Sequence, residues 1–427
     1  MATERKTVGQ VGDDRVGHRG DALAAWDDDT IDRHAEPARF VAGDAADCDH
    51  RNRHAFLLIL SAPRCAARTI PASCFASPEA GSRLVDQRSN EPVKLFFDDR
   101  QTGHAPEREL HNGEFVPYAE SIDRLQSIVA ALDDWQPVRD FGREPLLAVH
   151  DPAYVAFLER AHDDWLTAGR SGDAIGYSFP IVRRRPLRFN RIDADIGAYS
   201  FDASTPIAAG TWTSAYWSAQ CALTALDRLN EGDAHAFALC RPPGHHAGRD
   251  YMGGYCYLNN AAIAARHAQA LGLGPIAILD VDYHHGNGTQ DIFYEDPAIF
   301  FASIHADPVT DYPFYWGHAD ECGEGAGEGA TLNLPLPRGT DGAAYRPALD
   351  TALRAIAAWG ARCLIVSFGA DTFSGDPISN FKLERQDYTT MARVIADLGL
   401  PTLVVMEGGY AVGDLGRNVA AFLAGFD

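Results

Sequence analysis

The chain has 427 residues, 46% of them hydrophobic, and a formal net charge of −22. This charge argues against nucleic acid as a partner, because the phosphates would repel the chain. No apolar run approaches the roughly 20 residues that a membrane-spanning helix requires, so we expect no membrane segment. The eight cysteines form no CxxC pair, which is typical of reduced thiols in a cytoplasmic protein.

Residues 1–92 differ from the rest of the chain. They are rich in Asp, Arg, Ala and His and show no sustained apolar periodicity. Such a segment buries too little surface to offset the entropy that it loses on ordering. We therefore predict that residues 1–92 are disordered or a non-native extension of the reading frame, and that residues 93–427 form one domain.

From residue 93 onward, apolar strands alternate with amphipathic helices. The first strand is predicted at 93–99, and a polar loop over 100–115 follows it. Helices are predicted at 118–134 and 152–168, and a long irregular loop covers 170–210. Further strands are expected near 235–240, from 276, and at 300–305, 363–371 and 402–410, with helices at 211–229, 258–271, 342–359, 387–398 and 414–425. This alternation predicts an α/β domain whose central, mostly parallel sheet is covered by helices on both faces.

Polar residues collect where these strands end, which is where parallel sheets bind ligands. Side chains alternate along a strand, so Asp280, Asp282 and His284 point the same way. Burying two carboxylates side by side is costly unless a cation lies between them. Asp282, His284 and Asp371 therefore supply three metal ligands and leave one position open, as in a catalytic zinc site. Ferrous iron suits the same donors, and a solvated loop of chance Asp and His residues is the alternative.

Two further turns carry candidate catalytic groups. His245 and His246 are adjacent and cannot both bind one compact metal site without strain, so we interpret them as a proton-transfer pair. Tyr410 follows two glycines, which allow a loop to approach a metal closely, and its hydroxyl is suited to donate to an oxyanion. The alternatives are two structural histidines and a tyrosine that only packs.

Six longer segments follow one another along the chain: RPPGHHAG, GGYCYLNNAA, ILDVDYHHGNGTQDIFY, FASIH, GADTF and MEGGY. In this order they resemble the motifs of the histone deacetylase and acetylpolyamine amidohydrolase superfamily, whose fold is arginase-like. The resemblance runs from about residue 93 to the end and implies a deacetylase-like catalytic domain. It is strongest to bacterial acetylpolyamine amidohydrolases, through SFP at 178–180, RPPGHHAG, and DPISNFKL at 376–383.

The resemblance implies a role for each metal-site candidate. Asp282, His284 and Asp371 resemble zinc ligands, and Tyr410 resembles the tyrosine that polarises the acetyl carbonyl. A second, monovalent cation site, for potassium, is implied at Asp280, Asp282, His284, Ser303 and Ile304.

The resemblance also pairs each tandem histidine with a partner. Asp280 resembles the carboxylate behind His245, and Asn287 falls where His246 finds its partner. Many histone deacetylases carry Asp at that second position, whereas the amidohydrolases carry Asn. Which histidine acts as base and which as acid stays open.

Substrate-binding residues are implied as well. Tyr255 and Tyr312 resemble the aromatic walls of an acyl-lysine or acyl-polyamine channel, and Ile378 falls beside them. The Gly254 carbonyl is placed to accept the scissile N–H. The implied reaction hydrolyses an N-acetyl amide to acetate and a free amine.

The choice of substrate depends on acidic residues. Glu109 and Asp193 fall where the amidohydrolases place carboxylates for a distal ammonium, and Ser204 falls at a third such position. Solvated surface charge is the alternative for both acids. Histone deacetylases present a rim aspartate where this chain has Pro152, one residue past Asp151, which weakens the peptide interpretation.

We therefore predict a small cationic N-acetylated amine as substrate. The resemblance to the amidohydrolases also implies a homodimer whose long loop, here at 170–210, narrows the channel. Deacetylation of acetyl-lysine in proteins is the first alternative. A catalytically silent relative is a second alternative, although no metal ligand and no Tyr410 has been lost. Arginase-type hydrolysis would need two metals and a richer set of aspartates.

Overall fold

The computed structural model describes residues 92–180 and 189–427. The chain divides into two units, residues 1–60 and 61–427, and every described residue belongs to the second. The predicted disorder or extension over residues 1–91 lies outside the described residues, as do residues 181–188 of the predicted long loop.

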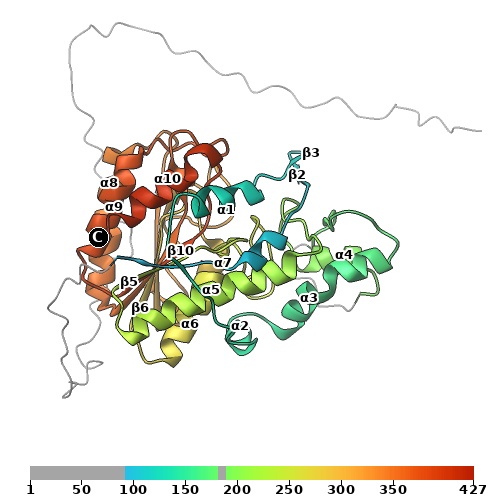
Figure 1. Cartoon of the computed structure of the whole chain (residues 1–427), viewed down its shortest axis with the longest axis horizontal. Helices are drawn as coiled ribbons and strands as arrows, with labels where there is room; N and C mark the ends of the chain where they lie inside the picture. Colours follow the sequence, from blue (N-terminus) through green and yellow to red (C-terminus); the bar gives the residue numbers. More distant parts are fainter. Residues whose placement is uncertain (1–91, 181–188) are drawn as a thin grey trace, which may run out of the picture. The chain divides into compact units, whose positions relative to one another are not determined.

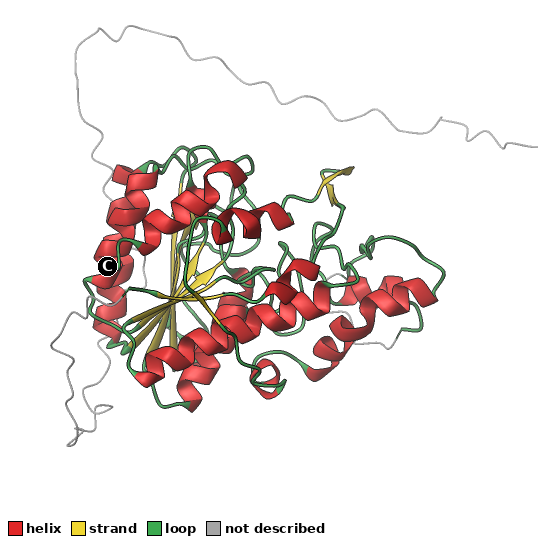
Figure 2. Ribbon diagram, viewed as in Figure 1, coloured by secondary structure: helices red, strands yellow, loops and turns green. Residues whose placement is uncertain are grey.

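A single eight-stranded sheet forms the centre of this unit, and every neighbouring pair in it is parallel. Figure 2 shows it edge-on between helices. The strands are β1 (Lys94–Phe96), β4 (Trp135–Gln136), β5 (His235–Ala238), β6 (Ile276–Asp280), β7 (Ile299–Ala306), β8 (Thr331–Leu336), β9 (Cys363–Phe368) and β10 (Thr402–Met406). The predicted fold class is therefore confirmed.

Helices cover both faces of the sheet (Figure 1). They are α1 (Ile122–Val129), α2 (Glu144–Leu147), α3 (Pro152–Thr167), α4 (Ile192–Ala198), α5 (Thr211–Glu231), α6 (Asn260–Ala270), α7 (Asn287–Phe293), α8 (Gly342–Trp359), α9 (Arg385–Ala396) and α10 (Val412–Leu423). No helix in the described part of the chain is both long and apolar enough to cross a bilayer.

The strands form because they are apolar on both faces. Alternate residues of one strand enter two different cores, so Ile276 and Ile278 pack with α5 and α6, whereas Ala277 and Leu279 pack with α1, α8, α9 and α10. All five residues of β6 are buried. A strand that is covered on both sides must read as a continuous apolar run, as this one does up to its final aspartate.

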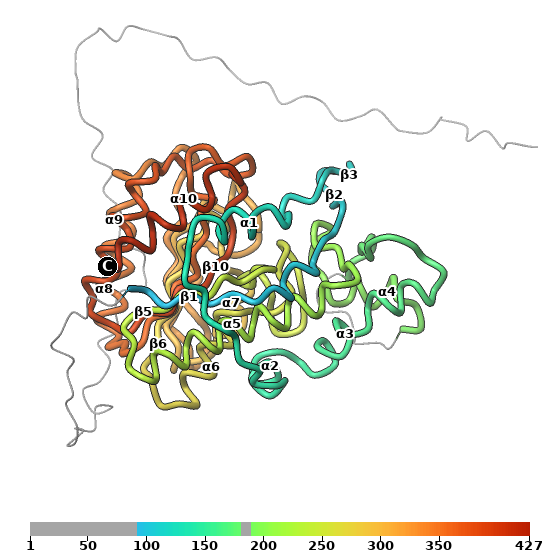
Figure 3. Tube along the Cα trace, in the orientation of Figure 1, coloured from blue at the N-terminus to red at the C-terminus, as the bar shows by residue number. Residues whose placement is uncertain are grey.

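The order of the strands places the chemically important ends together. Along the chain the sequence is β5, β6, β9, β10, but in the sheet these four are consecutive neighbours in the order β5-β10-β9-β6. The last strand in the chain thus returns to the middle of the sheet, and Figure 3 shows it in the red of the C-terminal part of the chain. Because all four are parallel, their carboxyl ends lie at the same edge.

Two loop predictions were wrong. Residues 108–117 within the predicted polar loop form an antiparallel hairpin of β2 (Arg108–His111) and β3 (Glu114–Pro117). Its turn is Asn112-Gly113, with φ of 50° and 85°, the pair that a two-residue hairpin turn favours. The predicted irregular stretch at 170–210 contains α4, and the helix predicted at 118–134 is limited to α1.

Candidate active site

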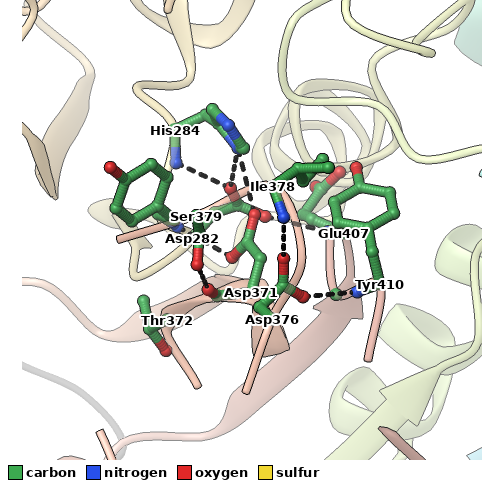
Figure 4. Close-up of polar contacts among 12 residues, drawn as sticks. Asp282, His284, Asp371, Thr372, Asp376, Ile378, Ser379, Glu407 and Tyr410 are labelled. Atoms are coloured by element: carbon green, nitrogen blue, oxygen red, sulfur yellow. Dashed lines mark hydrogen bonds and ion pairs between the residues drawn. The ribbon is translucent and has the colours of Figure 1, made fainter. Parts of the chain in front are cut away.

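Asp282, His284 and Asp371 converge beyond the carboxyl ends of β6 and β9. One ligand atom from each lies within 4.8 Å of the others. Nδ1 of His284 is 3.3 Å from Oδ1 of Asp282 and 3.0 Å from Oδ2 of Asp371. Figure 4 shows these three side chains directed at one another. Both carboxylates are fully buried.

Two glycines make room for these carboxylates. A Cβ at Gly369 would lie 1.9 Å from Oδ2 of Asp282, and a Cβ at Gly408 would lie 2.6 Å from Oδ2 of Asp371. Any side chain at either position would displace a carboxylate. The glycines of SFGAD and MEGGY are therefore required by the packing of the acidic pair.

Backbone N–H groups fix the orientation of both carboxylates. Gly408 N donates to Oδ2 of Asp282 at 2.8 Å, and Tyr283 N donates to Oδ1 of Asp371 at 2.9 Å. Burial and the neighbouring Asp282 raise the pKa of Asp371 to about 7. Two buried carboxylates and an imidazole nitrogen, each with a lone pair facing a common point, fit a divalent cation, which would remove this repulsion.

The tandem histidines lie beside this metal-site candidate and meet different partners. Nδ1 of His245 is 3.0 Å from Oδ2 of Asp280, and Nδ1 of His246 is 2.7 Å from Oδ1 of Asn287. Nε2 of His245 lies 3.9 Å from Oδ1 of Asp282. Both rings are 3% exposed.

These partners separate the two pKa values. Burial alone would lower the pKa of His245, but Asp282 and Asp280 outweigh it and raise that pKa to about 10. Burial, together with the charges of His245 and His284, lowers the pKa of His246 well below its ordinary value. The partners therefore raise the pKa of His245 and leave that of His246 low.

Tyr410 is held from three directions. Its backbone N–H donates to Oδ2 of Asp376 at 2.6 Å, as Figure 4 shows. The guanidinium of Arg124 lies 4.9 Å from the centroid of its ring and donates to the carbonyl of Gly409 at 2.5 Å. The Tyr255 ring packs against the Tyr410 ring with a centroid distance of 5.7 Å. Its hydroxyl has no hydrogen-bond partner among the described residues, which leaves it available to a ligand.

Gly254 and Tyr312 contact the ring of His246, whereas Tyr255 contacts Glu109 and Tyr410. The Tyr312 ring lies edge-on to the His246 ring at 5.2 Å. Gly254 lies against the same ring, since a Cβ there would be 2.2 Å from Cδ2 of His246. The Tyr255 hydroxyl donates to Oε1 of Glu109 at 3.0 Å.

Glu109 is 3% exposed, and its second oxygen, Oε2, has no partner among the described residues. Burial raises the pKa of this carboxyl to about 7, although the hydrogen bond from Tyr255 lowers it. A buried carboxylate with one free oxygen is suited to receive a cation. We call Asp280, Asp282, His284, Asp371, His245 and His246 the strand-end cluster. The loop cluster comprises Glu109, Gly254, Tyr255, Tyr312 and Asp202, whose carboxylate accepts from Gly254 N and the Tyr312 hydroxyl.

Ile378 and Asp193, which were also predicted to bind substrate, lie in different surroundings. Ile378 is 39% exposed, and its N–H donates to Asp376, the residue that also holds Tyr410. Asp193 forms ion pairs with Arg170 and Arg191 at 2.7 and 2.6 Å. Its charge is therefore already neutralised, and its role with an ammonium stays a prediction.

Asp280 and Ser303, two of the residues predicted to bind potassium, lie in the neighbouring strands β6 and β7. Asp280 is opposite Ser303 in the register of β6 and β7. Its Oδ1 accepts from Asp282 N at 3.1 Å, while Ser303 Oγ lies 2.8 Å from Nδ1 of His305. The potassium site, which also includes Ile304, stays a prediction.

Four supporting residues were missed in the sequence: Arg124, Asp202, Asp376 and Glu407. Glu407 is buried and accepts from the N–H groups of Gly244 and His245 at 2.7 and 3.1 Å. Burial raises its pKa to about 7, although His245 lowers it. Asp376 and Glu407 fall inside the quoted motifs DPISNFKL and MEGGY, so their position was a usable signal. Arg124 and Asp202 carried none.

Comparison with known proteins shows the family of the chain. The family model for the histone deacetylase domain matches residues 118–426. An acetylpolyamine amidohydrolase of Pseudomonas aeruginosa is 48% identical over 342 residues, covering 78% of this chain and 98% of its own. That of Mycoplana ramosa is 49% identical over 336 residues, with the same coverage.

A crystal structure of an acetylpolyamine aminohydrolase from Burkholderia pseudomallei superimposes with a TM-score of 0.74 at 38% identity. It covers 78% of this chain and 98% of the solved chain. The chain belongs to the histone deacetylase family.

Proposed function

We propose that this chain is a metal-dependent amidohydrolase that removes acetyl groups from acetylated polyamines and similar N-acetylated amines and releases acetate. The observation that carries the proposal is the convergence of Asp282, His284 and Asp371 with two histidines and Tyr410 at one edge of the sheet. The similarity to acetylpolyamine amidohydrolases over 78% of the chain supports the substrate class.

Zinc is the cation that we propose for Asp282, His284 and Asp371, and ferrous iron suits the same donors. Such a cation, when bound, supplies a Lewis acid that lowers the pKa of water and polarises a carbonyl group. We also propose a structural potassium ion near Asp280 and Ser303, which the register of β6 and β7 brings together.

His246 is the proposed base that takes the proton of the attacking water. Its Nδ1–H donates to the carboxamide oxygen of Asn287, so Nε2 keeps a free lone pair. His245, paired with Asp280, stays charged beside it. A histidine then returns a proton to the leaving amine.

Tyr410 donates its hydroxyl to the carbonyl oxygen as that oxygen gains negative charge. Its ring is fixed by Arg124, and its backbone N–H is fixed by Asp376. The carbonyl of Gly254 accepts the amide N–H of the substrate. Glu109, beside Tyr255, attracts the distal ammonium group, which is present both in the acetylated substrate and in the released amine.

The peptide alternative lacks a rim aspartate in this chain. The Asp151 carboxylate accepts from Ala153 N at 2.7 Å and caps α3. Because this carboxylate caps the helix, it does not serve as a rim aspartate, which favours a small amine over a peptide as substrate.

We further propose a homodimer in the cytoplasm. Val309, Phe314 and Tyr315 are 74, 49 and 80% exposed in one short loop, and an exposed apolar patch of this kind is typical of an interface. Cys221, Cys240, Cys256 and Cys363 are buried free thiols, as expected in a reducing compartment. Light scattering of the purified protein tests the dimer.

A deacetylation panel with zinc tests the proposed reaction: acetylputrescine, acetylcadaverine, acetylspermidine and acetyl-lysine peptides. We expect turnover of the polyamines and weak turnover of the peptides. A strong preference for the peptides would replace the polyamine proposal with protein deacetylation. Absence of turnover with zinc bound would favour a silent relative.

A further inference from the structure

Asp202 lies in the loop between α4 and α5 and is half-buried. Its carboxylate accepts five hydrogen bonds. Three donors are local: Ser204 N at 3.2 Å, Ser204 Oγ at 3.0 Å and Thr205 Oγ1 at 2.9 Å. The other two are distant in the sequence: Gly254 N at 2.7 Å and the Tyr312 hydroxyl at 2.8 Å.

The Gly254-Tyr255 backbone requires such support. Both residues have positive φ, 54° and 67°, and a tyrosine in that region is strained unless its surroundings hold it. Asp202 accepts the N–H of Gly254 directly. The N–H of Tyr255 donates to Thr205 Oγ1 at 3.1 Å, and that hydroxyl donates in turn to Asp202. Asp202 thus holds two consecutive peptide N–H groups, one directly and the other through the Thr205 hydroxyl.

Two adjacent residues of this loop, Phe201 and Asp202, fix the Tyr312 side chain. Its hydroxyl donates to Asp202, and its ring stacks on Phe201 with a centroid distance of 5.9 Å and an interplanar angle of 22°. Its edge faces His246. Any movement of Asp202 would therefore move Tyr312 relative to His246.

We propose that Asp202 is a positioning residue for the reaction: it holds the Gly254 peptide and the Tyr312 ring against His246. The inference rests on the proposed function. A carboxylate is required here because all five partners are donors. A carboxamide would turn an N–H₂ group toward at least one backbone N–H or hydroxyl donor.

The test is a double-mutant cycle of Asp202→Asn and Tyr312→Phe, with acetylputrescine as substrate and zinc content measured for each variant. We expect Asp202→Asn to lower kcat/KM about 10–100-fold, since a small misplacement of positioning groups has this effect. Tyr312→Phe should cost less, and the double variant should match Asp202→Asn, because both changes break one link. Asp202→Glu should recover part of the activity, and zinc content should stay at the wild-type level.

A matched control is available outside both clusters. Asp140 also accepts from a glycine N–H, that of Gly142 at 2.9 Å, and from a tyrosine hydroxyl, that of Tyr216. Asp140→Asn removes the same kinds of contact, and we expect kcat/KM within about twofold of the wild-type value, as for surface changes in general.

Unchanged kcat/KM in Asp202→Asn, fully additive effects with Tyr312→Phe, or loss of zinc in Asp202→Asn would each overturn the positioning role. Crystal structures of the wild type and Asp202→Asn give a readout that does not depend on the substrate. We expect the Gly254 peptide and the Tyr312 ring to shift, and unmoved groups would overturn the inference. A wild type inactive on the whole panel would instead refute the proposed function.

Discussion

The strand-end cluster follows the three parallel strands β5, β6 and β9, whereas the loop cluster is assembled from four segments outside the main sheet. Backbone pairing fixes the first: Asp280 is in register with Ser303 on one side and Ser367 on the other. Side-chain hydrogen bonds to two carboxylates, Glu109 and Asp202, fix the second. A metal site needs the rigid support, while a substrate contact tolerates adjustment. Changes in the strand-end cluster should therefore abolish activity, whereas changes in the loop cluster should lower activity less or alter specificity.

The largest effect is expected for Asp371→Ala. This change removes one of three proposed ligands, and the lost charge stabilisation of several kcal/mol corresponds to a fall of at least about 10³-fold in kcat/KM. Metal content by mass spectrometry should fall with it, and circular dichroism should show a folded protein. Retention of more than a tenth of the activity would exclude Asp371 as a ligand.

Tyr410→Phe should have the next largest effect on activity. Loops hold Tyr410, but its hydroxyl acts at the strand-end cluster. Removing one oxyanion donor lowers kcat about 10²–10³-fold. KM and zinc content should change little. Full activity in this variant would refute the role of the hydroxyl.

Asn287→Asp places a carboxylate behind His246. An adjacent negative charge favours the imidazolium, so the pKa of His246 rises. Because the proposed base must be neutral, the acid limb of the profile of kcat/KM against pH should move to higher pH. We expect about a tenfold loss at pH 7, if the pKa rises about one unit above it, and recovery in alkali. An unmoved acid limb would assign the base elsewhere.

Glu109→Gln tests the loop cluster through specificity. The pKa of Glu109 is raised to about 7, so its charge is present only above that pH, and KM for acetylputrescine should fall as pH rises through 7. The variant should show a KM raised about threefold to tenfold at pH 8, the range of a partly buried ion pair, with kcat unchanged. N-acetylbutylamine, which has no ammonium, serves as the matched substrate and should not respond. Equal effects on both substrates would exclude charge recognition.

The smallest effect is expected for Asp193→Asn. Its carboxylate is already paired with Arg170 and Arg191, so it has little charge to offer a substrate. We expect KM for acetylputrescine within about twofold of the wild-type value, as for surface ion pairs. A larger rise in KM, absent with N-acetylbutylamine, would restore Asp193 as an ammonium site.

The strand-end cluster could be predicted from sequence because apolar runs locate buried strands, and the polar residues that end them stand out. Asp280, Asp282 and Asp371 were found in this way. The order β5-β10-β9-β6 could not be predicted from periodicity, since each strand is apolar on both faces and does not encode its neighbours. The rule that parallel sheets bind ligands at the carboxyl ends of their strands indicated that these residues meet, and the resemblance to a known family supported it.

The loop cluster was less predictable because its residues depend on long-range hydrogen bonds. Asp202 lies in a stretch without periodicity, and its partners Gly254 and Tyr312 are 52 and 110 residues away. The Asn112-Gly113 hairpin that carries Glu109 had a readable turn signal, but the polar sequence around it concealed two short strands. Asp193 had the right charge, but its arginine partners were not apparent.

The central position of β10 has a consequence for synthesis of the protein. β10 is the last strand to leave the ribosome, yet it pairs with β5 and β9 and separates them. Until Thr402–Met406 and the residues up to Tyr410 are available, the sheet has a gap in its middle and the carboxylates lack Gly408. Pairings between such distant segments form slowly. Metal-binding competence would therefore appear only late in folding, and a chain that ends before residue 402 would expose two apolar strand edges, which favour aggregation.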